Sequence, residues 1–405
     1  MPIPMHDLQR ADRTLGQLAC IALQPVRWAR ALRRRGKPVE RVLLIKFWGI
    51  GSLELLTPAV RTLRRRHPSA ELHLLTLSPN GPFVQGLGIF DNVLAFDVSS
   101  SSWLQVCRHI AGLVLDLRSR RYDAVYDFEF FTRFSAVVSL LSGATVTRGF
   151  ASPSVWRGGF HTETSPFNRY WHVARNFRCL AGGESGFDVT HDELSTFRID
   201  AADEIEAATV LFEAGLGPGG PLIVLNPNAG TLSLERRWPR NRFAELARRL
   251  IVENGARVVL IGSAAEKEWT DDTAAMVGEV PGGRFANVSG KLSIGALHAL
   301  LDGAHVFVSN DSGPMHLGSA LGTPTIGLFG PETPIMYRPL GQRASFLYDP
   351  PPCSPCINVH NNKYTVCWRG RPECLMNLSV DRVHSRVLLE LEAGPKPQLR
   401  ELTRG

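Results

Sequence analysis

Residues Ser309–Pro334 read SNDSGPMHLGSALGTPTIGLFGPETP, and this stretch decides the fold. It follows an apolar run, Ala304–Val308, that predicts a buried strand, and Met315–Leu321 predicts a short helix. A second apolar run, Thr325–Phe329, then ends at a Gly-Pro pair. Strand, helix and strand in this order form one βαβ unit, and such units build parallel sheets.

The turn between the first strand and the helix has the residues of an anion site. Asn310, Asp311 and Ser312 are helix-capping residue types, and Pro314 fits the first helical turn, where its missing N–H would be unpaired anyway. Gly322 suits the left-handed position that ends a helix. The turn would present backbone N–H groups and the positive end of a helix dipole, which predicts binding of a phosphate or another anion.

The same alternation of apolar runs and helical patterns recurs along the chain and predicts two doubly wound α/β domains. In the first we expect the strands Arg41–Phe47, Glu71–Leu77, Val93–Phe96 and Ala124–Phe128 with the helices Leu53–Arg66 and Trp103–Ser119. In the second we expect the strands Leu222–Leu225, Arg257–Ile261, Phe285–Val288 and His305–Val308 with the helices Arg242–Asn254, Ile294–Leu301 and Val380–Leu391.

Shifts in composition predict the borders between these parts. Gly217-Pro218-Gly219-Gly220 is the clearest break and follows a predicted helix, Ala202–Ala214. Residues Ala181–Leu194 have the composition of a linker or an irregular crossover. We therefore expect a basic segment at residues 1–40, a first domain at 41–215, a second domain at 216–385 and a tail at 386–405.

The overall composition is that of a globular protein. The chain has 405 residues, of which 44% are hydrophobic and 20% are charged. No apolar run reaches the roughly 18 residues that cross a bilayer, and the first residues lack the pattern of a secretory signal. These features predict a cytoplasmic location.

The net charge of +7 is modest, but the arginines are clustered, most densely between Arg27 and Lys37. The preceding apolar residues of Leu15–Leu32 have near-helical spacing that Pro25 interrupts. Residues 1–40 therefore predict either a kinked amphipathic helix on an anionic membrane, at the inner face of the cytoplasmic membrane, or a helix docked on the first domain. No zinc-finger, RNA-motif or aromatic-interleaved basic pattern occurs, so we expect no nucleic-acid partner.

Four of the seven cysteines cluster as Cys353-Ser-Pro-Cys356, Cys367 and Cys374. The first pair has the spacing of a zinc knuckle, whereas the second pair is too far apart for a standard one. A structural zinc site and a set of reduced, unliganded thiols both remain open, and reduced thiols are the favoured interpretation.

Three strings that begin at Asp311, Gly322 and Leu328 together carry a family resemblance. Asp-Ser-Gly-Pro-Met-His-Leu, Gly-Thr-Pro-Thr and Leu-Phe-Gly-Pro resemble the donor-site signature of glycosyltransferase family 9, the ADP-heptose:lipopolysaccharide heptosyltransferases. The resemblance implies a GT-B fold of two Rossmann-like domains facing across a cleft. It also implies that this turn holds the diphosphate of a nucleotide-sugar, with contacts from Asp311, Ser312 and Gly313. His316 could contact a phosphate as well, and packing within the fold is the alternative for a histidine one turn into a helix.

The loop Asn226–Pro239 supplies further predicted donor contacts. Its basic pair Arg236-Arg237 before Trp238-Pro239 resembles the phosphate-binding position of the family, and a guanidinium can hold a phosphate with two hydrogen bonds. Two solvated surface arginines are the alternative. Thr231 in the same loop could donate its hydroxyl to the diphosphate. The resemblance places the nucleoside near Gly262, Glu266 and Lys291.

Gly49-Ile50-Gly51 follows the first predicted strand. A dinucleotide-binding fingerprint does not fit, because Glu54 stands where the third glycine belongs. The segment Lys46–Gly51 instead resembles the acceptor-side loop of the family, and Arg133 could bind an acceptor phosphate or carboxylate. The predicted acceptor-binding residues are Gly49, Gly51, Ser52 and Arg133.

The chain departs from the family pattern at Ser52. Family members typically carry an aspartate there, assigned as the general base, and a serine hydroxyl has no useful basicity near neutral pH. Glu129, one step past the strand Ala124–Phe128, is the first candidate for the base, and Glu54 is the second. Carboxylates that only make local hydrogen bonds at a strand end are the alternative.

These residues predict an inverting glycosyltransferase that moves a sugar such as heptose from a nucleotide-diphosphate sugar, with ADP as the expected nucleotide, to a lipopolysaccharide or related lipid-linked surface glycan. The resemblance implies no cofactor and no catalytic metal, and the sequence has no Asp-x-Asp motif. Two alternatives remain open: a non-catalytic nucleotide-sugar-binding relative, which Ser52 suggests, and a GT-B-fold nucleotide-sugar epimerase.

Overall fold

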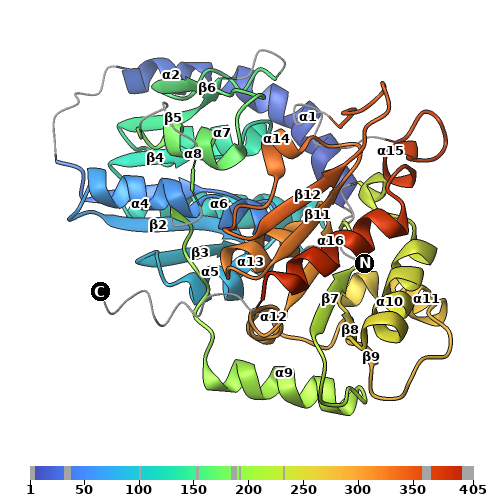
Figure 1. Cartoon of the computed structure of the whole chain (residues 1–405). Coiled ribbons are helices and arrows are strands. Elements are labelled where there is room, and N and C mark those ends of the chain that lie inside the picture. The colour runs from blue at the N-terminus through green and yellow to red at the C-terminus, as the bar shows by residue number, and fades with distance from the viewer. Residues whose placement is uncertain are drawn as a thin grey trace. The chain divides into compact units, whose positions relative to one another are not determined.

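The computed structural model describes residues 5–31, 38–99, 102–151, 155–183, 189–190, 193–230, 233–357 and 366–394. The chain forms two compact units that divide between Val189 and Thr190 (Figure 1). Among the described residues, no helix has the length and apolar character required to cross a membrane.

The first unit is built on a six-stranded parallel sheet with the strand order β3-β2-β1-β4-β5-β6. Its central strand, β1, pairs Val42 with Leu72 on one side and with Ala124 on the other. A strand that is buried on both faces is apolar along its length, and for this reason the apolar run predicted β1 from the sequence. The strands are β1 (Arg41–Ile45), β2 (Glu71–Leu77), β3 (Asn92–Phe96), β4 (Ala124–Asp127), β5 (Val146–Ala151) and β6 (Glu163–Pro166).

Helices cover both faces of this first sheet. Leu117 of α6 and Val138 of α7 pack with Leu43 and Val125 on one face, and α8 packs on the other, where Phe177 meets Phe128 edge-on. The helices are α1 (Met5–Ala22), α2 (Gln24–Ala31), α3 (Ile50–Glu54), α4 (Thr57–Arg66), α5 (Gly81–Leu87), α6 (Trp103–Ser119), α7 (Arg133–Leu141) and α8 (Val173–Leu180).

The second unit repeats this plan, with the strand order β12-β11-β10-β7-β8-β9. Trp238 and Phe243, the latter on α10, belong to its main core together with apolar residues of β7, β8, β10, β11 and α16. The strands are β7 (Leu222–Asn226), β8 (Arg257–Leu260), β9 (Phe285–Asn287), β10 (Val306–Asn310), β11 (Thr325–Phe329) and β12 (Ala344–Tyr348). The helices are α9 (Ala201–Glu213), α10 (Arg240–Asn254), α11 (Lys267–Ala275), α12 (Ile294–Asp302), α13 (Gly313–Ala320), α14 (Pro334–Tyr337), α15 (Glu373–Met376) and α16 (Val380–Glu392).

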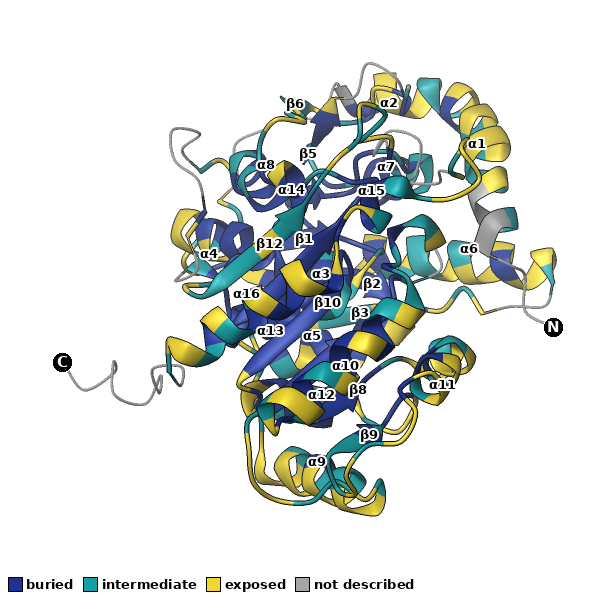
Figure 2. Cartoon of the chain, turned by 45° about the vertical axis from the view of Figure 1, so that its right-hand side comes forward, coloured by how far each residue is buried: buried dark blue, intermediate teal, exposed yellow. Residues whose placement is uncertain are grey.

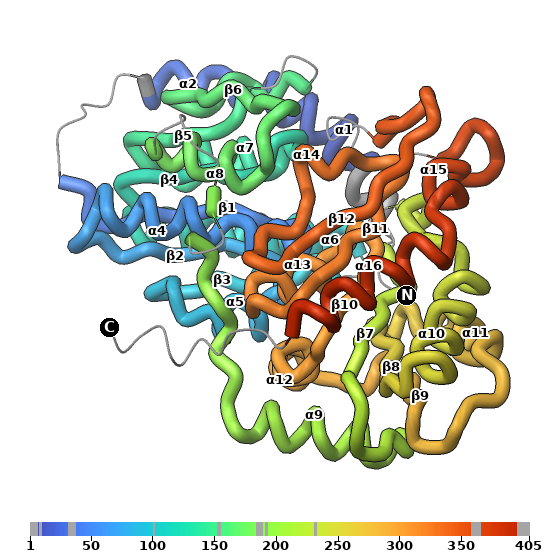
Figure 3. The backbone as a smooth tube through the Cα atoms, viewed as in Figure 1, coloured from blue at the N-terminus to red at the C-terminus, as the bar shows by residue number. Residues whose placement is uncertain are grey.

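Both sheets therefore have the same topology, which can be followed along the tube in Figure 3. Counted from the first strand of each unit, the order is 3-2-1-4-5-6, the order of a Rossmann fold. Its first and fourth strands, β1 with β4 and β7 with β10, are neighbours whose connections leave in opposite directions, so their carboxyl ends border a crevice. The prediction of two Rossmann-like domains is confirmed, and each unit has one switch point where a ligand site belongs.

The predicted single helix Leu53–Arg66 is wrong, because the structure has two helices there, α3 and α4. Pro58, in the first turn of α4, has no N–H to donate to the carbonyl of Glu54. The Thr57 hydroxyl donates to that carbonyl instead, at 2.9 Å.

The division between the units also differs from the predicted border after residue 215. Helix α9 packs against α12, and Glu206 accepts hydrogen bonds from the backbone N–H and the hydroxyl of Ser293, at 2.8 and 2.7 Å. This helix therefore belongs to the second unit, and the chain divides within the segment 181–194 that has linker composition. The tail does not begin at residue 386, since α16 continues to Glu392.

The basic N-terminal segment is docked on the first unit. Asp12 of α1 accepts hydrogen bonds from the backbone N–H groups of Arg133 and Phe134, at 3.0 and 2.7 Å, and so caps α7 from a distant part of the chain. Cys20 is buried against Leu140 and Phe160. Of the two predicted arrangements of residues 1–40, a helix docked on the domain is present in the described part.

Candidate functional site

In the second unit, the turn from β10 to α13 lies at the switch point. Ser312 is the residue before α13, but its hydroxyl makes no capping hydrogen bond to the helix. It accepts a hydrogen bond from Asn226 of β7 at 3.0 Å instead. Gly313 opens the helix, and the buried His316 lies in the first turn. The Ser312 side chain therefore does not cap the start of the helix. An anion-binding helix terminus requires this, because the anion binds the same backbone N–H groups that a side-chain cap would occupy.

Arg236 braces this turn from the neighbouring loop. It is buried, and its two terminal nitrogens donate to the carbonyl oxygens of Asp311 and Ala229, at 2.7 and 2.6 Å. It also lies 3.4 Å from the Asp311 carboxylate. These contacts engage both terminal nitrogens, whereas the buried Nε has no hydrogen-bond partner among the described residues. Arg236 thus fixes the shape of the two loops that follow β7 and β10.

Arg237 is in a different position. Its guanidinium lies 4.5 Å from the ring centre of Trp269, and Arg240 lies over the same ring at 4.9 Å. Burial lowers the pKa of Arg237, and nearby Glu266 opposes that shift. The side chain makes no hydrogen bond to another described residue, so its fork remains available to an anion.

The three residues predicted to lie near the nucleoside are found on adjoining turns. Glu266 accepts from the backbone N–H of Gly230 at 3.0 Å and holds the β7 loop in place. A Cβ at Gly262 would lie 2.6 Å from the Asn228 amide nitrogen, so no larger residue fits there. Lys291 is exposed and directly follows Gly290, whose backbone N–H donates to the Gly262 carbonyl. Thr231 lies outside the described residues.

In the first unit, Glu129 lies at the switch point between β1 and β4. Its Oε1 accepts from the Lys46 ammonium at 2.8 Å and from the backbone N–H of Phe47 at 2.7 Å. Its Oε2 is equally buried and has no hydrogen-bond partner among the described residues. A buried carboxylate oxygen without a partner is costly, and such atoms occur where a substrate or water completes the contact.

Asp127 holds the backbone of Glu129. Its Oδ1 accepts the Glu129 N–H at 3.0 Å, while Oδ2 is bound by Arg157, by Ser135 at 3.0 Å and by His161 at 3.1 Å. Burial opposes ionisation, but the Arg157 charge and the His161 contact keep the pKa of Asp127 below its usual value. Asp127 is thus saturated by internal partners, whereas Glu129 keeps one oxygen open.

Glu54 is a weaker candidate base. It is 1% exposed, and burial raises its pKa well above the usual range. Burial disfavours the charged form of this carboxyl group, and the charged form is the one that a base needs. The structure therefore favours Glu129 over Glu54.

The predicted acceptor-binding residues lie at the start of α3 and of α7. Gly49 precedes α3 with a φ of 80°, a conformation that favours glycine, and Gly51 and Ser52 lie within the helix. These three follow β1 directly, as Glu129 follows β4. Arg133 opens α7, and its side chain lies against α1, where a Cβ at Gly16 would be 3.0 Å from the Arg133 Cβ.

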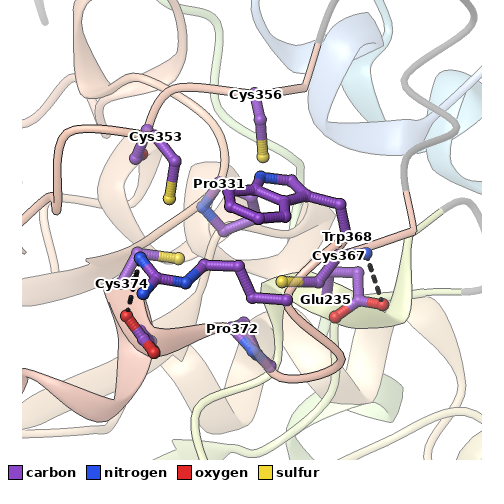
Figure 4. Close-up of a pocket in the computed structure, with 11 residues that line it drawn as sticks. Glu235, Pro331, Cys353, Cys356, Cys367, Trp368, Pro372 and Cys374 are labelled. Carbon is purple, nitrogen blue, oxygen red and sulfur yellow. Dashed lines mark hydrogen bonds and ion pairs between the residues drawn. The ribbon is translucent and has the colours of Figure 1, made fainter.

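The four clustered cysteines line one pocket in the second unit (Figure 4). The Cys367 N–H donates to Glu235 at 3.1 Å, so the pocket adjoins the loop that carries Arg236. Burial, together with the neighbouring thiols, raises the pKa of Cys374 to about 12. Among the described residues, no group of three or more His, Cys, Asp or Glu is arranged to hold a metal ion.

Lys46 and Asn226 have contacts that the sequence did not reveal. Lys46 begins the segment that resembles the acceptor-side loop, but it had no assigned role. Its partner, Glu129, lies 83 residues away in the sequence. Asn226 ends β7, and its contact with Ser312 spans 86 residues. A polar residue at the end of a buried strand was the available signal in both cases.

The sequence matches the model of glycosyltransferase family 9 (heptosyltransferase) over residues 110–365. It is 25% identical to lipopolysaccharide heptosyltransferase 2 of Escherichia coli K12 over 312 residues, which cover 75% of this chain and 86% of that protein.

Solved structures share the fold. E. coli ADP-heptose lipopolysaccharide heptosyltransferase II superimposes with a TM-score of 0.67 at 21% identity, over 87% of this chain and 99% of that one. E. coli heptosyltransferase WaaC with ADP-2-deoxy-2-fluoro heptose gives a TM-score of 0.62 at 18% identity, over 87% and 99% of the two chains. The protein therefore belongs to glycosyltransferase family 9 and is a glycosyltransferase of the GT-B fold.

Proposed function

We propose that this enzyme transfers heptose from ADP-heptose to a lipopolysaccharide-type acceptor, with inversion at the anomeric carbon. The choice of heptose as the sugar and lipopolysaccharide as the acceptor rests on its relatives. Among them are the E. coli lipopolysaccharide heptosyltransferase and WaaC with an ADP-heptose analogue. The observation that carries the mechanism is the open, buried Oε2 of Glu129 at a switch point.

Inversion needs one base and a good leaving group. Glu129 Oε2 takes the proton of the acceptor hydroxyl, the hydroxyl oxygen attacks the anomeric carbon, and the bond from that carbon to ADP breaks. The Lys46 contact and the backbone donors on Oε1 hold the carboxylate in one orientation before the reaction. Ser52, in the position of the usual aspartate, is then not required as a base.

The departing ADP carries the negative charge away. The first-turn amides of α13 and the free fork of Arg237 are the groups that would meet the diphosphate, and Arg236 would keep the turn in shape. We propose that these groups take the place of a metal ion. The sequence has no Asp-x-Asp motif to hold a metal on a diphosphate.

We further propose that the reaction takes place on the cytoplasmic side of the membrane, at its inner face, where a lipid-linked acceptor is within reach. The exposed apolar and basic residues of α1 and α2 support this location.

The test is a donor screen by ADP or UDP release from ADP-heptose, ADP-glucose and UDP-sugars, each with and without a heptose-deficient lipopolysaccharide acceptor. Acceptor-dependent ADP release from ADP-heptose, an inverted anomer in the product by NMR and full activity in EDTA are expected. Donor binding without transfer to any acceptor would favour the non-catalytic alternative. Conversion of the nucleotide-sugar without acceptor would favour the epimerase.

A further inference from the structure

Five large apolar side chains are exposed within a short part of the N-terminal helices. They are Leu15, Leu18, Ile21, Val26 and Trp28, and Leu18 and Trp28 are 62% and 64% exposed. In Figure 2 much of the ribbon of α1 and α2 has the colour of exposed residues. Exposed apolar residues scattered singly are ordinary, but a contiguous set indicates a partner.

These side chains do not belong to a loosely attached segment. The opposite side of the two helices is fixed to the first unit by Asp12 and Cys20, as described above, and further along by Arg30. Arg30 is buried and donates to the Thr147 hydroxyl at 3.0 Å, and Gln24 donates to the Gly158 carbonyl at 3.0 Å. Backbone hydrogen bonds from Leu23 to Ala19 and from Arg27 to Leu23 carry the helical path across the bend. The exposed side is therefore a surface of fixed shape.

Beyond Asp7, which lies 3.9 Å from Arg10 at the start of α1, the charge on this surface is basic. From Arg13 to Lys37 the chain has seven basic residues and no acidic one. Arg13 and Arg27 are exposed on the helices themselves, and Asp12 is turned inward to cap α7. Leucine and tryptophan bordered by arginine are typical of a helix lying in a lipid headgroup layer, and the excess of basic residues matches an anionic surface.

We propose that the exposed side of α1 and α2 is a docking surface for an anionic lipid bilayer, with Leu15, Leu18, Ile21 and Trp28 inserted at the headgroup level. The surface lies parallel to the bilayer, and the arginines contact the acidic headgroups. This inference rests on the proposed function only in that a lipid-linked acceptor would be met at such a surface; lipid binding itself needs neither donor nor acceptor.

The experiment is co-sedimentation of the full chain with vesicles of phosphatidylglycerol and phosphatidylethanolamine, in the absence of substrates. We expect binding that weakens at high salt and is weak to phosphatidylcholine alone. The double variant Leu18→Ser, Trp28→Ser should bind at least about tenfold less tightly, because it removes two inserted side chains. A matched control is Leu115→Ser, Phe212→Ser, whose side chains on α6 and α9 are 68% and 80% exposed; it should bind like the wild type.

A second variant tests the charges, with glutamine in place of Arg10, Arg13 and Arg27. It should lose most of the preference for phosphatidylglycerol while its folding transition is unchanged. No vesicle binding by the wild type, or equal loss in the control variant, would overturn the proposal. The proposal would also be overturned if light scattering showed a dimer that the Leu18→Ser, Trp28→Ser variant abolishes, while no vesicle binding is found. The surface would then bind a second copy of the chain. Because no transfer is measured, a failure here is distinct from a failure of the proposed reaction.

Discussion

Glu129 and Lys46 form a buried ion pair, with 2.8 Å between the Glu129 Oε1 and the Lys46 nitrogen. Lys46 directly follows β1 and Glu129 comes two residues after β4, and these neighbouring strands border the switch point of the first sheet. A pair that only stabilised the fold would be expected to satisfy both carboxylate oxygens, because an open one is costly in the interior. One oxygen is held by three donors and the other by no described residue, which is the arrangement that the proposed base requires.

Replacing Glu129 by glutamine should lower kcat by roughly 10²- to 10⁴-fold, because the amide cannot take the proton of the acceptor hydroxyl. Donor affinity should be nearly unchanged, since no donor contact is assigned to this residue. Initial rates of ADP release and calorimetric titration with ADP check the two halves of the statement.

Glu54→Gln is the matched control for the base. It replaces a buried carboxyl group, whose charged form burial disfavours, by an amide of the same size, so turnover should stay close to that of the wild type. If Glu54→Gln lost activity and Glu129→Gln kept it, the assignment of the base would be reversed.

The parallel sheets were predictable because buried central strands must be apolar. Arg41–Ile45 and Val306–Asn310 are such strands, and each ends at polar or glycine residues that mark the site. The edge strand β6, which reads ETSP, has no such pattern. Helix α7 depends on Asp12, which lies 121 residues earlier, so its capping residue could not be found in the local sequence.

The same limit applies to the site. Glu129 and Arg236 were identifiable by position, but what each one does depends on partners that are distant in sequence. The Asp311 carbonyl that occupies Arg236 lies 75 residues away, and this contact changes the expected role of Arg236 from a diphosphate ligand to a brace. Glu54 was correctly expected in a helix, yet only its burial in the structure showed that its pKa is raised.

Ser312→Asp should abolish binding of a nucleotide diphosphate, because it places a negative charge next to the first-turn amides of α13. The fold should persist, as judged by circular dichroism and thermal unfolding. Ser379→Asp is a matched control, since Ser379 caps α16 at an exposed position and aspartate is an equally good cap. Unchanged ADP affinity of Ser312→Asp in calorimetry would refute the assignment of the diphosphate to this turn.

Arg236 and Arg237 should respond differently to alanine. Arg237→Ala should weaken ADP binding by about 1.5–3 kcal/mol, the usual loss for a charge-assisted hydrogen bond, with little change in thermal stability. Arg236→Ala should lower both the melting temperature and the ADP affinity, because two buried carbonyl groups lose their donor. A double variant with wild-type affinity would show that neither side chain supports the donor site.

His298 should make the second unit sensitive to acid. Its ring stacks on Phe197 with 4.1 Å between ring centres, and burial lowers its pKa from 6.5 to about 4. Because the unfolded chain binds the proton more readily, the stabilisation is complete above pH 6.5 and is lost as the pH falls towards 4. The whole effect amounts to about 3 kcal/mol of unfolding free energy.

The variant His298→Phe keeps an aromatic ring against Phe197 but has no group to protonate. Urea unfolding of the wild type and the variant at several pH values between 7 and 4 measures the difference directly, and other titrating groups cancel in it. The wild type should lose stability relative to His298→Phe as the pH falls, whereas His109→Phe, at an exposed position on α6, should follow the wild type. If the free energy of unfolding changed with pH in the same way for the wild type and His298→Phe, protonation of His298 would not destabilise the folded second unit, and the prediction would be wrong.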